Sequence, residues 1–73
     1  MTTKETIFRA LCCNTFVGQK GFTKHDIFIW TQQIDSSISD GENVGRSIWS
    51  LVYEGLIEVI NPGHKPVKFR RIK

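Results

Sequence analysis

The residues with the clearest chemical character form a basic cluster at one end of this 73-residue sequence. Its five members, within the last nine positions, are Lys65, Lys68, Arg70, Arg71 and Lys73. No acidic residue follows Glu58, whereas the chain up to that position carries five basic and seven acidic groups. Such a patch attracts a polyanion, first a nucleic acid and second an anionic membrane surface. A merely solvated basic terminus is the alternative on charge alone.

Other reactive residue types form no recognisable site. Cys12 and Cys13 are neighbours, and adjacent cysteines rarely meet disulfide geometry. Together with His25 and His64 they match no zinc-ligand spacing, and the sequence contains neither a Gly-x-Ser-x-Gly elbow nor a P-loop. We therefore predict no enzyme activity, metal, cofactor or small-molecule substrate. One or both thiols are expected to pack as small apolar groups on a helix.

Length and composition predict one small globular domain over residues 1–73. A chain this short must place nearly every apolar residue in its core. No apolar run is long enough to cross a bilayer, and the segment from Met1 to Glu5 leads into a mixed stretch without a signal-peptide core. We expect a cytoplasmic protein with no membrane partner.

Three capping patterns, each a Thr or Ser followed three positions later by an acidic residue, predict three helices. The helices are expected over residues 3–13, 24–34 and 40–54, after the pairs Thr2/Glu5, Thr23/Asp26 and Ser39/Glu42. Gly55 is a natural stop for the third helix. Residues 14–21 are expected to form a loop in which Phe16 and Val17 fold back onto the core.

Apolar residues at helical spacing predict the buried face of each helix. In the first helix these positions are Ile7, Ala10 and Leu11, with Phe8 at the edge. In the second helix they are Ile27, Trp30 and Ile34, and in the third Val44, Ile48, Leu51 and Val52. Phe28 and Ile29 point away from the second of these faces. The opposite side of the third helix carries Asn43, Arg46, Ser47, Ser50 and Tyr53.

Two β-prone runs, residues 56–60 and 67–72, surround a Pro/Gly loop and predict a hairpin. Val67 and Phe69 share a face, but Ile72 lies on the other face unless a bulge occurs near Arg70–Arg71. The predicted class is therefore α+β, with three helices followed by a C-terminal hairpin.

The third helix and the run after it follow a known pattern. The helix opens with a valine and, two residues later, an arginine, which are Val44 and Arg46. Two apolar positions follow, Ile48 and Leu51. A Gly-Leu-Ile turn, residues Gly55, Leu56 and Ile57, then leads into a strand. This stretch resembles the third helix and first wing strand of winged helix-turn-helix regulators. Phe22-Thr23 with Ile27 looks like the start of the family's second helix, so the resemblance covers about residues 22–72. The segment from Ile34 to Asn43 is several residues longer than in most members.

The resemblance implies a three-helix winged helix-turn-helix fold with a C-terminal β-hairpin wing, in a small bacterial or phage-type transcriptional regulator that binds double-stranded DNA. The compact size suits a phage or mobile-element protein. A major groove admits one helix, and Arg, Asn and Ser read base edges there. Groove contacts are expected from Asn43, Arg46, Ser47, Ser50 and Tyr53. Phosphate or minor-groove contacts are expected from the wing residues His64, Lys65, Lys68 and Arg70.

The alternative function is a winged helix that binds protein. Phe28 and Ile29, together with Trp49 at the edge of the third helix, would form an exposed apolar patch, and such patches tend to mark interfaces. The partner would be a second copy, giving a homodimer, or a host protein such as an RNA polymerase subunit. Coverage of these side chains by the long loops is the alternative to an interface.

Overall fold

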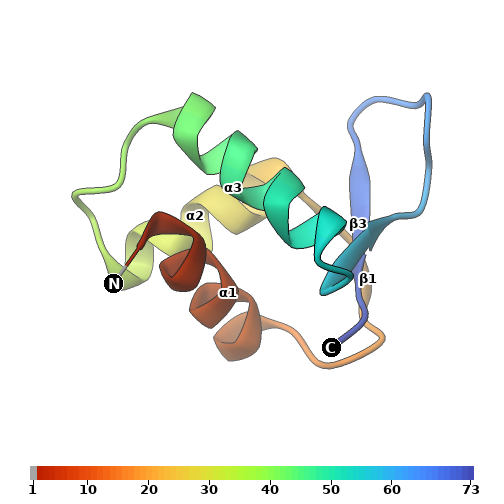
Figure 1. Ribbon diagram of the computed structural model, residues 1–73, viewed down its shortest axis with the longest axis horizontal. Helices are drawn as coiled ribbons and strands as arrows, with labels where there is room; N and C mark the ends of the chain where they lie inside the picture. Colours follow the sequence, from red (N-terminus) through yellow and green to blue (C-terminus); the bar gives the residue numbers. More distant parts are fainter. Residues whose placement is uncertain (1) are drawn as a thin grey trace.

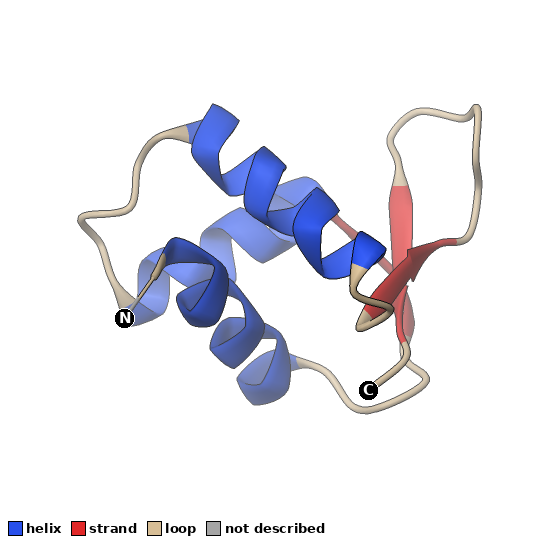
Figure 2. Cartoon of the chain, in the orientation of Figure 1, coloured by secondary structure: helices blue, strands red, loops and turns tan. Residues whose placement is uncertain are grey.

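The computed structural model describes residues 2–73, and Met1 lies outside them. Its elements are α1 (Thr3–Asn14), β1 (Lys20–Thr23), α2 (Lys24–Ile34), α3 (Gly41–Tyr53), β2 (Ile57–Val59) and β3 (Lys68–Arg71). The helices gather toward one end, and an antiparallel three-stranded sheet stands at the other (Figures 1 and 2). The predicted α+β class is confirmed, and the arrangement is compatible with a winged helix. In residues 2–73 no helix is long and apolar enough to cross a membrane.

The helix starts follow the capping chemistry, with one correction. The first two predicted capping boxes are present, and α1 and α2 begin where the sequence indicates. The Ser39–Glu42 box is wrong, because α3 begins after Asp40 instead. The Asp40 carboxylate accepts the N–H groups of Glu42 and Asn43 at 3.0 and 3.3 Å. A carboxylate here satisfies two free donors and places negative charge at the positive end of the helix dipole.

The end of α3 is a Schellman motif, as the position of Gly55 predicts. Gly55 has a φ of +77°, which a residue without a Cβ adopts easily. Its N–H donates to the Val52 carbonyl, and the Leu56 N–H donates to the Leu51 carbonyl, both at 3.0 Å. This turn leads the chain directly from α3 into β2.

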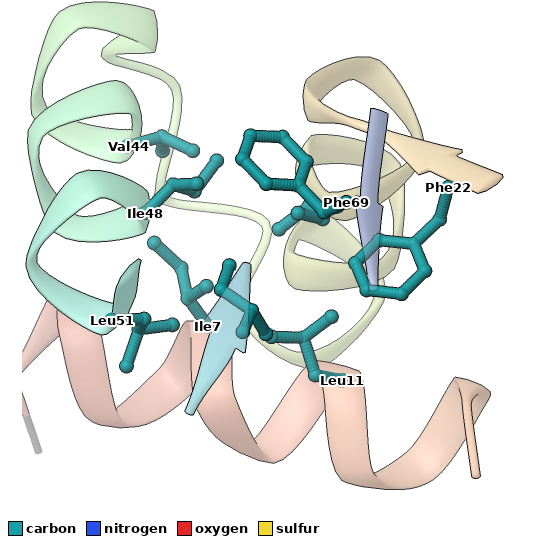
Figure 3. Close-up of a cluster of buried hydrophobic side chains, with 9 residues drawn as sticks. Ile7, Leu11, Phe22, Val44, Ile48, Leu51 and Phe69 are labelled. Atoms are coloured by element: carbon teal, nitrogen blue, oxygen red, sulfur yellow. The ribbon is translucent and has the colours of Figure 1, made fainter. Parts of the chain in front are cut away.

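The core lies between the three helices and the inner face of the sheet (Figure 3). Its buried members are Ile7, Leu11, Phe22, Ile27, Val44, Ile48, Leu51, Ile57 and Phe69. The predicted buried faces of α1 and α3 are confirmed, with Ala10 also buried and with Phe8 and Val52 half-buried at the edges.

On α2 the predicted face is partly wrong. Ile27 is buried and Trp30 half-buried, but Ile34 is exposed, because it is the last residue of the helix and the chain leaves the core there. Thr31 is fully buried in its place. Its hydroxyl donates to the Ile27 carbonyl at 2.7 Å, so its polar group carries no desolvation penalty. Phe28 packs against the core instead of pointing away.

The sheet has the order β1-β3-β2, and β1 was not predicted; its first two residues lie in the segment that was expected to form a loop. Lys20 pairs with Arg70 while Phe22 pairs with Phe69, so Gly21 is an extra residue with a φ of +98°. The irregularity of register therefore lies in β1, whereas β3 pairs regularly with β2 from Phe69 to Arg71. Because one extra residue switches the faces of a strand, Lys20 points outward and Phe22 points into the core.

The loop between α1 and β1 does not fold onto the core. Phe16 and Val17 are 68% and 60% exposed, so that prediction is wrong. The loop is closed by polar contacts instead: the Gly18 N–H donates to the Arg71 carbonyl at 2.8 Å, and the Arg71 guanidinium donates to the Thr15 carbonyl at 2.7 Å. With the inner sheet face already filled by buried rings, no core position remains for these two side chains.

The expected packing of the two cysteines as apolar groups is also wrong. Cys12 and Cys13 are free thiols, and both are exposed rather than packed in the core, because Leu11 takes the buried position of that helical turn. An Arg71 Nη2–H donates to the Cys12 sulfur at 3.4 Å. Across the described residues, no group of three or more His, Cys, Asp and Glu side chains is placed to hold a metal ion.

Candidate nucleic-acid interface

The side of α3 opposite the core presents the most exposed of the predicted groove residues. The Arg46 side chain is 76% exposed, and Tyr53 is 88% exposed. Trp49 and Ser50 complete this surface, with Trp49 43% exposed and Ser50 half-buried. We call these four residues the α3 face. A long cation, a hydroxyl and two aromatic rings provide both hydrogen-bonding and stacking groups.

Two predicted groove residues lie to one side of this face. The Asn43 Nδ2 donates to the Thr3 hydroxyl of α1 at 3.3 Å. Ser47 follows one helical turn later on the same side and is half-buried. Asn43 therefore borders α1, and Ser47 is less exposed than Arg46 and Tyr53.

Arg46 has an ionic partner on its own helix. Its Nη2 lies 3.6 Å from the Glu42 carboxylate, and the two side chains are 76% and 87% exposed. Exposed pairs at this spacing contribute only about 0.3–0.5 kcal/mol. The guanidinium is thus weakly held and can exchange Glu42 for another acceptor.

A row of aromatic rings fixes the sheet against α3. Ring centroids are 6.0 Å apart between Trp30 and Phe22, 6.3 Å between Phe22 and Phe69, and 6.0 Å between Phe69 and Trp49. Phe22 and Phe69 lie in the core in Figure 3. Because such ring contacts favour specific tilts, the row sets the position of β3 beside the α3 face.

The two cations predicted on the last strand of the hairpin, Lys68 and Arg70, differ in whether a carboxylate pairs with them. Arg70 lies opposite Glu58 on β2, and its Nη2 approaches that carboxylate to 2.6 Å. Lys68 is exposed and makes no ion pair among residues 2–73. Lys68 is therefore the freer cation, whereas the charge of Arg70 is already neutralised in part by Glu58.

The loop between β2 and β3 is held in shape by one side chain. The Asn61 carbonyl oxygen accepts the Lys68 N–H at 2.7 Å, and its amide donates to the Pro66 carbonyl at 3.0 Å. The Asn61 main-chain carbonyl also accepts the His64 N–H at 3.1 Å. These contacts order the loop that presents the exposed side chains of His64 and Lys65.

The structure adds three basic residues that sequence reasoning missed. Because β3 pairs with β1, and α2 follows β1 directly, the start of α2 lies beside the hairpin. A hollow of about 450 Å³ between them is lined by Thr23, Lys24, His25, Lys65, Pro66 and Val67. Lys20 lies opposite Arg70 on the outer face of the sheet. No sequence signal marked these positions, because the pairing of β1 was not predicted.

These residues and the hairpin cations form one surface, which we call the basic end. It consists of Lys20, Lys24, His25, His64, Lys65 and Lys68, all of them exposed. Within the described chain, none of the six forms an ion pair with a carboxylate. The four unpaired lysines among them suit a phosphate backbone, because the binding of cations releases its condensed counterions.

The far end of the molecule has the opposite character. The loop from α2 to α3 lies at the end remote from the hairpin loop (Figure 1). It carries Asp35 and Asp40, which line a hollow of about 340 Å³ together with polar residues of α1. The Ser37 hydroxyl and N–H donate to the Asp35 carboxylate and hold its pKa below the ordinary value. The two carboxylates give this end a negative charge, which disfavours a polyanion.

The predicted exposed apolar patch has fewer exposed residues than the sequence indicated. Phe28 is half-buried against the core, so it does not belong to the exposed apolar patch that the sequence predicted. Ile29 and Trp49 remain, 41% and 43% exposed, on different helices.

No protein-family model matches the chain, and the comparisons with curated proteins and with solved structures give no match. Its function is therefore inferred from the residues of the site.

Proposed function

We propose that this chain is a winged helix-turn-helix protein that binds double-stranded DNA, with α3 in the major groove and the β2–β3 hairpin on the phosphate backbone. The observation that carries the proposal is the adjacency of the α3 face and the basic end. One surface offers side chains of the types that read bases, and β3, which contacts α3 through Phe69 and Trp49, carries the unpaired cation Lys68. In DNA recognition, contacts to base edges usually give specificity, and contacts to phosphates position the protein.

The order of elements supports the same proposal. A helix, a short strand, two helices and a hairpin place the hairpin beside the last helix. The exposed end of α3 that carries Trp49 and Tyr53 lies next to the sheet, whereas the acidic loop lies at the far end. A duplex would therefore meet the hairpin side of α3 and extend away from Asp35 and Asp40.

Fluorescence titration of random duplex DNA over a range of salt concentrations tests the proposal. The parent chain should bind, with a log–log salt slope that falls by about 0.9 for each phosphate contact removed. Replacing Lys65 and Lys68 with Gln should reduce the slope. The control replaces Lys4 and Arg9 of α1 with Gln, which removes the same charge away from the basic end and should leave the slope unchanged. Absence of duplex binding at low salt, or equal slopes in the two double variants, would contradict the proposal.

A protein-binding function is the second candidate, favoured by the exposed apolar side chains. Ile29 on α2 and Trp49 on α3 are exposed, and Phe16 and Val17 in the loop after α1 are more exposed than either. A partner that uses these residues would bind a chain whose weak DNA affinity is insensitive to Arg46. Light scattering at high concentration tests the simplest case, a second copy. A strict monomer that Ile29→Ser leaves unchanged would exclude the homodimer.

A further inference from the structure

Gly45 is an unexpected residue in the middle of α3. Glycine weakens a helix interior relative to alanine, and this one has ordinary helical backbone geometry, so no turn requires it. Gly45 is nevertheless buried, on the side of α3 that meets the start of α2. The reason for its presence lies in what covers it.

The Lys24 side chain occupies the space that a side chain at position 45 would fill. A Cβ built on Gly45 would lie 2.9 Å from the Lys24 Nζ and 3.3 Å from its Cε. The first distance is shorter than real Cβ contacts, so a methyl group would displace the ammonium group. Lys24 thus crosses from the first residue of α2 onto the surface of α3.

The position of Lys24 connects the two halves of the proposed interface. It lines the hollow shared with Lys65 of the hairpin loop, and also a second hollow of about 420 Å³ with Phe28 and Gly41. His25 lines both hollows. Lys24 makes no ion pair with a carboxylate of residues 2–73, so its charge is free for a ligand.

We propose that the absent side chain at Gly45 positions the Lys24 ammonium group between α3 and the hairpin, where Lys24 binds a phosphate group of the duplex. Gly45 is then a positioning residue and Lys24 a binding residue. The inference rests on the proposed function and adds to it a cation from outside α3 and the hairpin. The glycine lowers the helix propensity of α3, but it leaves the space in which the Lys24 ammonium group lies.

The substitution Gly45→Ala separates binding from stability, because the two effects have opposite signs. Alanine favours the helix, and the displaced atoms are the far end of a flexible side chain, so Tm should rise. DNA binding should weaken, because the ammonium group is pushed from its position. Each contact is worth roughly threefold in affinity between about 50 and 200 mM salt, so the ratio of the two Kd values should shrink roughly threefold.

Two further variants establish the cause. Lys24→Ala should reproduce the loss of salt dependence, and adding Gly45→Ala to Lys24→Ala should cause no further loss, because both changes remove the same group. Arg9→Ala is the matched control for Lys24→Ala: it removes one positive charge from an exposed position of α1, away from the basic end. It should leave binding unchanged.

The outcomes are distinguishable. If the parent chain binds duplex DNA and Gly45→Ala binds with the same affinity and salt slope, this inference is wrong while the proposed function stands. If Gly45→Ala still weakens binding in the Lys24→Ala background, the methyl group itself obstructs the duplex and Lys24 is not the cause. If the parent chain does not bind duplex DNA, the proposed function and this inference are both overturned.

Discussion

The two sides of α3 follow different rules. On its inner side Val44, Ile48 and Leu51 are at most 1% exposed, at the positions that helical spacing predicts. On its outer side the Asn43 side chain donates to the Thr3 hydroxyl of α1, although the same spacing groups it with the residues proposed to contact DNA. In α3 the pattern within the helix predicts which residues are buried, whereas the role of an exposed residue depends on which neighbouring element lies beside it.

The largest expected effect is on the inner side. Leu51→Ala should lower the free energy of unfolding by about 2–5 kcal/mol, because it removes buried methyl groups and leaves a cavity. A domain with roughly 5 kcal/mol of total stability would then be partly unfolded near body temperature. Thermal and urea unfolding followed by circular dichroism measure the change. Ser50→Ala, at the adjacent outward position, should change stability by no more than about 0.5 kcal/mol. Equal losses in both variants would mean that the two sides are assigned wrongly.

The next effect is on the outer side and concerns binding. Arg46→Ala should cost about 1–3 kcal/mol on a duplex selected for tight binding, because arginine pairs with two acceptors of guanine. Binding to random duplex should hardly change. Arg9→Ala on α1 is the control and should preserve sequence preference. If selection from random duplexes yields no preferred sequence, or if Arg46→Ala retains the preference, α3 does not read bases through this residue.

A smaller effect comes from the start of α3. Asp40→Ala should destabilise the protein by about 1 kcal/mol, because two helix N–H groups lose their acceptor. Ser39→Ala should have almost no effect, because the structure assigns no capping contact to its side chain. Urea unfolding of the two single variants distinguishes them. The reverse order of stability would restore the capping box that the sequence suggested.

The three helices, their main buried faces and the hairpin could be predicted because each depends on contacts within about four residues or on one strong turn. The strand β1 could not. It is four residues long and contains Gly21, and only pairing with β3, nearly fifty residues later, makes it a strand. The same pairing brings Lys20, Lys24 and His25 to the hairpin, so the error in the fold and the omission from the site have one cause.

The exposed positions of Phe16 and Val17 illustrate the other limit. Apolar type alone predicts burial, but only so many rings fit the inner side of a three-stranded sheet, and Phe22 and Phe69 already fill it. The competition between side chains for core volume is a property of the whole fold. Hydrophobic spacing along one segment contains no information about it.

The smallest prediction concerns Glu42, where the outer side of α3 affects binding and stability in opposite directions. Glu42→Gln removes the partner of Arg46 and a negative charge from the first turn of the helix, so Tm should fall slightly. DNA binding should strengthen, because the guanidinium loses a competitor and the phosphates lose a repelling carboxylate. Glu54→Gln makes the same change in net charge but removes the partner of Lys4 at the α1 side, and should strengthen binding less. Fluorescence titration at low salt compares the two variants. Equal gains would reflect net charge alone, whereas a larger gain for Glu42→Gln would place the duplex nearer to Arg46 than to the Lys4–Glu54 pair.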